Sequence, residues 1–396
     1  QRRQIIDMKH APIQIAFLTP EYPHPRTLGL CGGIGTSIMN LANAMHKAQA
    51  TVSIIVYGQD LDEVFEENGL TIYKVKSVEN RKLHRYHTQK KLEKLINSLV
   101  KHKKINVIEA PDWRGATSFI SANCPTVVKL HGSETYFGHF DQRPVKWRIR
   151  FAEKRALQKA DAVISVSQFA ADVTSEIFKL RKKMTVIPNG IDRNKFKVSP
   201  SNDTDNILYF GTLARKKGSL ELPMIFNKVI EQNPSAQLTL VGLNSNDPAT
   251  SNASVWKMIQ ESLSPEALPN THYAGSVPYN EIKNYINDAA VCVFPSFAEA
   301  LPVSWIEAMA MEKAIVASNI GWAKELIVDG EEGFLIHPTH HQAFANKIVQ
   351  LLSDNQLRDK FGASARQKVE KQFSIEAVAE QNLSFYHNLL RSTKRH

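Results

Sequence analysis

Short, continuously apolar runs alternate along the chain with longer segments in which apolar residues recur at helical spacing. Each run is too short for a buried helix and predicts a strand buried on both faces of a parallel sheet. The segments between the runs predict helices that cover the sheet. In the first half the predicted strands are Ile13–Leu18, Val52–Tyr57, Asn106–Glu109, Thr126–Leu130 and Asp161–Ser167.

The same alternation starts again in the second half of the chain. Between the halves, Lys197–Asn206 is rich in Ser, Asn and Asp and predicts a linker. A length of 396 residues allows two domains of ordinary size, so we expect α/β domains at residues 1–198 and 205–373. The predicted strands of the second domain are Ile207–Phe210, Gln237–Val241, Val291–Phe294, Ala314–Ala317 and Gly333–Ile336.

The segment after Val291–Phe294 carries two carboxylates at the start of a predicted helix. Pro302 stands where a first helical residue would, which places Glu299 in a loop and Glu307 in the helix. A helix N-terminus attracts anions, and carboxylates accept hydrogen bonds from sugar hydroxyls. The segment therefore indicates a ligand with both phosphate and sugar, while two solvated glutamates remain the alternative.

A glycine-rich turn joins the first predicted strand to a helix. It contains Gly32, Gly33 and Gly35, and this order of strand, glycine turn and helix can hold a phosphate on backbone amides. The dinucleotide-binding spacing G-x-G-x-x-G fails, because Thr36, Ser37 and Ile38 follow.

Several of these motifs, in this order, resemble family 4 of the retaining glycosyltransferases. They are Gly32-Gly33-Ile34-Gly35, the segment K-L-H-G-S-E around His131, V-I-P-N-G-I-D from Val186, and E-x7-E from Glu299. The resemblance covers residues 13 to 373 and implies the GT-B fold, in which two doubly wound Rossmann-like domains face each other across a cleft. It also implies that a last helix, residues 375–392, returns to complete the first domain.

The resemblance further implies roles for individual residues. Glu307 would hold the ribose of a nucleotide-sugar donor and Glu299 its hexose, while His131 would contact the donor sugar. Lys217 and Arg215 would stabilise the diphosphate leaving group. The other implied donor contacts are Gly32, Gly33, Gly35, Thr212, Gly275, Ser276, Val277, Ala300, Leu301 and Pro302.

The chain departs from the family pattern at one donor-site position, and its acceptor side is assigned separately. Thr212 stands where an arginine follows the glycine in the common family pattern, so whether Arg215 replaces it is open. On the acceptor side, Glu109 and Asp112 lie in the loop at the end of a predicted strand and would face the acceptor.

The positive charge is concentrated in the first half of the chain. Residues 1–200 hold 32 Lys and Arg against 18 Asp and Glu, or +14, while residues 201–396 hold 17 against 21, or −4. Within the first half, Arg143–Lys159 interleaves basic residues with Trp147 and Phe151. These aromatic side chains either face the core or dock the protein on an anionic membrane or lipid-linked acceptor.

Composition indicates a cytoplasmic protein. Three widely separated cysteines fit a reducing compartment, and no signal peptide or membrane-spanning run is predicted. Asp60-Leu61-Asp62 reads as a solvated turn, so we expect no metal site and no cofactor apart from the donor. The chain has no recognisable nucleic-acid-binding module, so we expect no nucleic-acid partner.

The sequence therefore predicts a metal-independent, retaining hexosyltransferase. It would move a hexose from UDP-glucose or a related UDP-hexose to a hydroxyl of a glycan or lipid-linked acceptor, in polysaccharide or cell-envelope synthesis. The alternative is a sugar-nucleotide epimerase of the same fold with Asp112 or Glu109 as its base, and product analysis without an acceptor separates the two.

Overall fold

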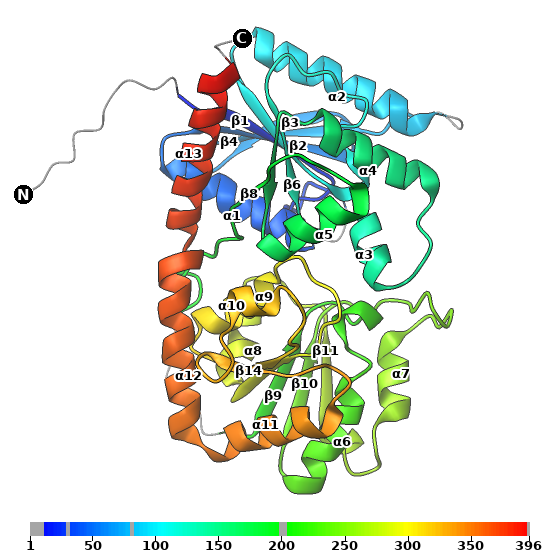
Figure 1. Cartoon of the computed structure of the whole chain (residues 1–396), viewed down its shortest axis with the longest axis vertical. Helices are drawn as coiled ribbons and strands as arrows, with labels where there is room; N and C mark the ends of the chain where they lie inside the picture. The colour runs from blue at the N-terminus through cyan, green and yellow to red at the C-terminus, as the bar shows by residue number, and fades with distance from the viewer. Residues whose placement is uncertain (1–11, 29–31, 80–82, 198–203, 394–396) are drawn as a thin grey trace, which may run out of the picture. The chain divides into compact units, whose positions relative to one another are not determined.

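The computed structural model describes residues 12–28, 32–79, 83–197 and 204–393, and these form two compact units (Figure 1). The first unit contains the described residues up to Tyr136, Pro144–Gly190 and the chain from Ile375 onward. The second contains Phe137–Arg143 and Ile191–Ser374. Most of the predicted linker and the N-terminal segment lie outside the described residues.

The first unit is built on an eight-stranded sheet with the order β3-β4-β2-β1-β5-β6-β7-β8. All neighbouring strands are parallel except β3, which pairs antiparallel with β4 at one edge. The strands are β1 (Gln14–Thr19), β2 (Thr51–Gln59), β3 (Glu63–Glu67), β4 (Leu70–Lys76), β5 (Val107–Pro111), β6 (Thr126–Leu130), β7 (Ala162–Ser165) and β8 (Thr185–Val186).

Helices cover both faces of this sheet. Successive residues of β1 point to opposite faces, and each face packs against different helices. Ile15 and Phe17 pack in one cluster with residues of α1 and α13, whereas Ala16 and Leu18 pack with residues of α2. Figure 1 shows α13, in red, alongside α1. The helices are α1 (Gly33–Lys47), α2 (His84–Lys101), η1 (Trp113–Gly115), α4 (Trp147–Lys159), α5 (Gln168–Phe178) and α13 (Ile375–Thr393). Helix α3 (Glu134–Phe140) begins in the first unit and ends in a segment assigned to the second.

The second unit is built on a six-stranded, fully parallel sheet with the order β11-β10-β9-β12-β13-β14. The strands are β9 (Asn206–Phe210), β10 (Gln237–Val241), β11 (Thr271–Gly275), β12 (Val291–Phe294), β13 (Ala314–Ala317) and β14 (Gly333–Leu335). The helical segments are η2 (Arg215–Lys217), α6 (Leu222–Gln232), α7 (Val255–Ser262), η3 (Leu268–Asn270), α8 (Ile282–Asp288), α9 (Val303–Ala310), α10 (Ala323–Leu326), α11 (His341–Ser353), α12 (Asn355–Lys368) and η4 (Val369–Phe373).

The predicted α/β alternation is confirmed, and the buried strands fall where the apolar runs predicted them. The edge hairpin β3–β4 and strand β11 were not predicted, because polar residues interrupt each of them. The predicted position of Pro302 is wrong by one residue: it is the N-cap of α9, with extended backbone at φ −72° and ψ 120°, and the helix begins at Val303. Among the described residues, no helix is long and apolar enough to cross a membrane.

Candidate active site

Lys217 and Glu299 form an ion pair between two loops at the carboxyl edge of the second sheet. The loops follow β9 and β12, which are neighbours in the sheet. The Lys217 Nζ lies 2.7 Å from both carboxylate oxygens of Glu299, and Ser296 Oγ donates to Oε1 at 3.1 Å. The Glu299 side chain is 7% exposed and that of Lys217 28%, so the pair lies at the boundary between core and solvent.

Close backbone contact fixes the two loops to each other. Gly218 has φ +68°, and a Cβ at this position would lie 1.7 Å from the carbonyl oxygen of Pro295. The amide groups of Phe297 and Ala298 both donate to the carbonyl oxygen of Lys216, at 2.8 and 3.2 Å. Glycine at position 218 therefore allows the approach that brings Lys217 to Glu299.

Lys216 is a third charged group at this edge, and the sequence analysis did not single it out. Its ammonium lies 3.8 Å from the ring centroid of Phe137. Burial, followed by the neighbouring charge of Lys217, lowers the pKa of Lys216 to about 8. A protonated Lys216 adds positive potential beside the Lys217–Glu299 pair, and part of that potential is lost in mildly alkaline solution.

Arg215 makes a two-pronged ion pair with Asp247. Its Nε and Nη2 donate to the two carboxylate oxygens at 3.0 and 2.7 Å, and Thr250 Oγ1 donates to Oδ2 at 2.6 Å. The Asp247 side chain is fully buried, and its hydrogen bonds with Arg215 lower its pKa to about 2. Arg215 is thus held by a carboxylate that sequence reasoning missed, since Asp247 lies in a polar loop.

Glu307 lies in α9 and is buried, with 5% of the residue exposed. Tyr279 donates its hydroxyl to Glu307 Oε1 at 2.8 Å, and no motif had pointed to this tyrosine. Burial raises the pKa of Glu307 to about 7, while the hydrogen bond from Tyr279 acts in the opposite direction. The carboxyl group therefore changes its charge near neutral pH.

This raised pKa predicts a pH-dependent stability that a glutamine removes. The unfolded chain releases the Glu307 proton near its ordinary pKa of 4.5 and the folded chain only near 7, so the free energy of unfolding falls as the pH rises through that window. A shift of this size corresponds to about 3 kcal/mol. Between pH 5 and pH 8, urea titrations should show the free energy of unfolding of Glu307→Gln falling by about 2.5 kcal/mol less than that of the wild type, because most but not all of the shift lies in this window. The exposed Glu331→Gln is the control, and equal pH dependence in the wild type and Glu307→Gln would contradict the raised pKa.

The other predicted donor contacts of the second unit fall into two groups. Ala300, Leu301 and Pro302 are buried between Glu299 and the start of α9. Thr212 follows β9, while Gly275 is the last residue of β11 and Ser276 and Val277 come after it. Thr212 and Ser276 are exposed, and Gly275 has φ +75° with no atom close to where a Cβ would stand.

In the first unit, His131 and Asp112 lie together at the carboxyl edge of the sheet, after β6 and β5. The backbone amide of His131 donates to Asp112 Oδ1 at 2.9 Å, while Oδ2 is buried without a hydrogen-bond partner among the described residues. Burial raises the pKa of Asp112 to about 7 and lowers that of His131 to about 3. His131 is therefore neutral at physiological pH.

Glu153, on α4, supports this edge of the first sheet and was not singled out from the sequence. Its buried carboxylate accepts from the backbone amides of Arg114, Glu134 and Thr135, at 3.1, 2.9 and 3.1 Å. These bonds fix the loops that follow Asp112 and His131.

The predicted position of Glu109 in an acceptor-facing loop is wrong. Glu109 lies inside β5, is 3% exposed, and accepts a hydrogen bond from Tyr386 of α13. Burial raises its pKa. It anchors the C-terminal helix to the sheet, which leaves Asp112 as the candidate at this strand end.

The glycine-rich turn leads into α1 as expected, with Gly32 as N-cap and Gly33 and Gly35 in the first turn. The amide of Gly35 donates to Glu21 Oε1 at 2.9 Å, and a Cβ on Gly32 would lie 3.1 Å from the same oxygen. A carboxylate thus lies where the turn was expected to hold a phosphate. The beginning of the turn, residues 29–31, lies outside the described residues.

Two family models match the chain, and together they cover most of it. Residues 31–195 match the model described as Glycosyltransferase Family 4, and residues 191–368 match that described as Glycosyl transferases group 1. The chain belongs to glycosyltransferase family 4.

Two relatives share about a quarter of their aligned residues with this glycosyltransferase. It is 26% identical over 258 residues to the capsular polysaccharide biosynthesis glycosyltransferase CapM of Staphylococcus aureus, a match that covers 61% of the chain and 65% of CapM. It is 25% identical over 398 residues to an uncharacterised glycosyltransferase of Methanocaldococcus jannaschii, covering 94% of the chain and 98% of that protein. The chain thus spans less than two thirds of CapM but nearly all of the archaeal protein.

Solved structures confirm the GT-B fold of the glycosyltransferase. A sucrose-phosphate synthase from Thermosynechococcus elongatus has a TM-score of 0.77 at 22% identity, with 96% of this chain and 100% of that chain covered. HepE from Anabaena, solved with UDP and glucose, has a TM-score of 0.72 at 22% identity, with 94% and 99% covered. At this identity the likeness concerns the fold.

Proposed function

We propose that this glycosyltransferase is a metal-independent, retaining hexosyltransferase that uses a UDP-hexose, with UDP-glucose as the first choice. The observation that carries the proposal is the Lys217–Glu299 pair, two opposite charges held by neighbouring loops at the carboxyl edge of the second sheet. Ligands of doubly wound sheets bind at this edge.

The cations at this edge suit a diphosphate leaving group. Negative charge grows on the diphosphate as the bond to the sugar breaks, and fixed positive groups stabilise it most in that state. Lys217 and Lys216 supply two ammonium groups from adjacent positions, and Arg215 adds a guanidinium. Three cations on one short segment can provide this stabilisation without a metal ion.

The carboxylates suit the hydroxyl groups of the donor. Lys217 and Ser296 orient the Glu299 carboxylate, an acceptor-only group that would share its acceptor sites between these donors and a hexose hydroxyl. Glu307 is oriented by Tyr279 and would accept from the ribose when ionised. Its pKa of about 7 implies that donor binding strengthens as the pH rises through neutrality.

The comparisons guide the choice of ligands. HepE has been solved with UDP-glucose as well as with UDP and glucose, and CapM is described as an enzyme of capsular polysaccharide biosynthesis. These relatives support our proposal that the acceptor hydroxyl belongs to a glycan or a lipid-linked sugar. In the retaining reaction we favour front-face attack, in which the departing phosphate takes the proton of the acceptor hydroxyl.

Calorimetric titration with UDP, GDP, UDP-glucose and UDP-galactose in the presence of EDTA tests the donor site. We expect micromolar binding of UDP that survives EDTA and weakens at least tenfold in Glu307→Gln, about 1.4 kcal/mol. Glu266→Gln, an exposed glutamate of the same unit, is the matched control. Failure of every nucleotide to bind would overturn the proposal, and binding lost with EDTA would overturn metal independence.

Helix α4 bears on where the reaction takes place. The aromatic side chains of this helix do not face the core: Trp147 is 71% and Phe151 50% exposed, one helical turn apart on the same face. Arg148 and Arg150 are exposed beside them, and Arg150 donates to the carbonyl oxygen of Ile177, which brings the α4 start close to the end of α5. Basic residues follow there at Lys179, Arg181, Lys182 and Lys183.

This surface combines two large apolar side chains with a surplus of cations, which fits the interface of an anionic bilayer. We propose that it docks the enzyme on the inner face of the membrane, where a lipid-linked acceptor would be presented. Flotation with vesicles containing phosphatidylglycerol should recover the wild type but not a Trp147→Ser/Phe151→Ser variant. Val64→Ser, 60% exposed in the same unit, is the control. Equal flotation of all three proteins would contradict docking through α4.

A further inference from the structure

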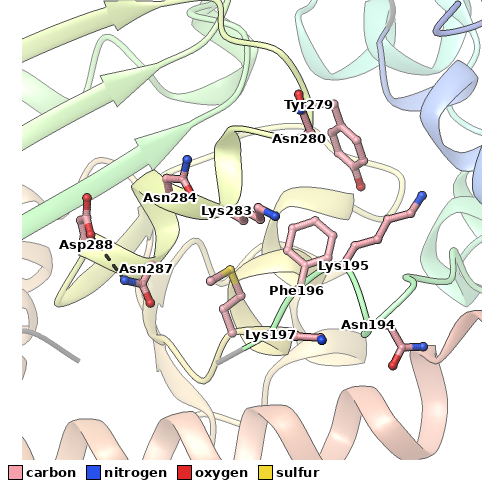
Figure 2. Close-up of a pocket in the computed structure, with 11 residues that line it drawn as sticks. Asn194, Lys195, Phe196, Lys197, Tyr279, Asn280, Lys283, Asn284, Asn287 and Asp288 are labelled. Atoms are coloured by element: carbon pink, nitrogen blue, oxygen red, sulfur yellow. Dashed lines mark hydrogen bonds between the residues drawn. The ribbon is translucent and has the colours of Figure 1, made fainter. Parts of the chain in front are cut away.

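The second unit contains a pocket of about 830 Å³ away from the Lys217–Glu299 pair (Figure 2). One wall is the segment Asn194–Lys197, and the other is the segment from Tyr279 to Asp288, which includes α8; Met311 completes the lining. Its volume is within the range of sites that enclose a small organic ligand, roughly 300–1,000 Å³. None of the roles proposed above uses this pocket.

The pocket is positively charged, although the unit that contains it is not. Three lysines line it, Lys195, Lys197 and Lys283, against one carboxylate, Asp288. The two segments of the second unit, Phe137–Arg143 and Ile191–Ser374, hold 18 Lys and Arg against 21 Asp and Glu, a net charge of −3, so this local surplus of cations is not an average property of the unit. Such a concave basic surface favours an anionic ligand.

The remaining lining suits hydroxyl groups and a sugar face. Asn194, Asn280, Asn284 and Asn287 offer amide groups that both donate and accept hydrogen bonds, as vicinal hydroxyls require. Phe196 and Tyr279 stand edge to face, with ring centroids 6.2 Å apart at 69°, and Figure 2 shows the Tyr279 ring above that of Phe196. The amide groups, the aromatic rings and the lysine side chains together favour a ligand with a hydroxylated ring and an acidic group.

We propose that this pocket binds an acidic saccharide, one that carries a carboxylate or phosphate group, at a site separate from the donor. The site also has a direct connection to the donor site, a step that rests on the function proposed above. The ring of Tyr279 lines the pocket, while its hydroxyl donates to Glu307, the proposed ribose ligand. A ligand that shifts Tyr279 changes the orientation of that carboxyl group, and linkage then makes the effects of saccharide and nucleotide on each other reciprocal.

Calorimetric titration of the full chain with glucose 6-phosphate, glucuronic acid, glucose and inorganic phosphate tests the pocket. We expect at least one acidic sugar to bind more tightly than glucose and than phosphate alone, and Lys283→Ala/Asn284→Ala to weaken it at least tenfold. Lys257→Ala, an exposed lysine on α7, should leave binding unchanged. The proposal is overturned if neither acidic sugar binds, if phosphate alone binds equally well, or if the pocket variant binds as the wild type does.

A second measurement separates this proposal from the donor assignment. The affinity for UDP should change in the presence of the saturating acidic sugar, and Tyr279→Phe, which keeps the pocket wall but removes the bond to Glu307, should abolish that change. Acidic sugar binding without any UDP binding would sustain the pocket and defeat the proposed function. UDP binding with no acidic sugar binding would do the reverse.

Discussion

Replacing Lys217 with methionine should lower the rate of sugar transfer about 10²–10³-fold, the typical loss when one group that stabilises developing negative charge is removed. Methionine keeps much of the length and volume of the lysine side chain but no charge. The same variant leaves the Glu299 carboxylate, 7% exposed, without its cation, which destabilises the fold. The rate loss and the stability loss must therefore be separated.

The double variant Lys217→Met/Glu299→Gln makes this separation. Glutamine removes the buried charge that Lys217 compensated, so the double variant should recover most of the free energy of unfolding. Its transfer rate should still fall about 10²–10³-fold below that of Glu299→Gln alone, which loses the proposed hexose contact but keeps Lys217. UDP release from the preferred UDP-sugar gives the rate, and urea titration gives the stability. Lys324→Met, an exposed lysine of the same unit, is the control. If the double variant transfers sugar as fast as Glu299→Gln does, the role of Lys217 is structural only.

The sequence predicts those parts of the structure that depend on local patterns of apolar and polar residues. The predicted strand Val291–Phe294 has the same bounds as β12. A continuously apolar run is typical of a strand in the interior of a parallel sheet, where both of its faces are buried. Glu299 was found because it follows such a strand at the start of a predicted helix, and Lys217 because the segment Gly211–Gly218 resembles the family pattern. The carboxyl ends of parallel strands meet at one edge, where both residues were expected. Their direct pairing follows from β9 and β12 being neighbours, which no local pattern shows.

The parts that could not be read depend on contacts between distant segments. Glu109 looked like the polar end of a strand, but its carboxylate is satisfied by Tyr386, 277 positions later in the chain. Asp247 lies in the polar stretch Asn244–Asn252, which has the composition of a solvated loop. Contacts between the loops after β9 and β10, among them the bridge between Leu213 and Asn244, bring it to Arg215. Edge strand β3 was hidden by its three glutamates.

Asp247 leads to the second large prediction, because the family pattern places an arginine where this chain has Thr212. The guanidinium of Arg215 has five N–H donors, and Asp247 engages its Nε and Nη2 through two hydrogen bonds. The buried carboxylate holds the group in one orientation, so the remaining donors can serve a diphosphate without first being ordered. Arg215 then takes the role of the missing arginine, with Asp247 as a positioning residue.

Asp247→Asn should therefore weaken UDP binding about tenfold or more, the effect of one lost charge-assisted hydrogen bond. The binding of uridine, which lacks the diphosphate, should hardly change. Arg215→Lys, which keeps the charge but not the fork, should show the same selective loss for UDP. Thr250→Val removes the bond from Thr250 to Asp247, together with a weak contact to Met258 Sδ at 4.0 Å, and should give a smaller change. Equal losses for UDP and uridine would mean that Asp247 supports the fold of the loop alone, since a purely structural defect does not distinguish a nucleoside from its diphosphate.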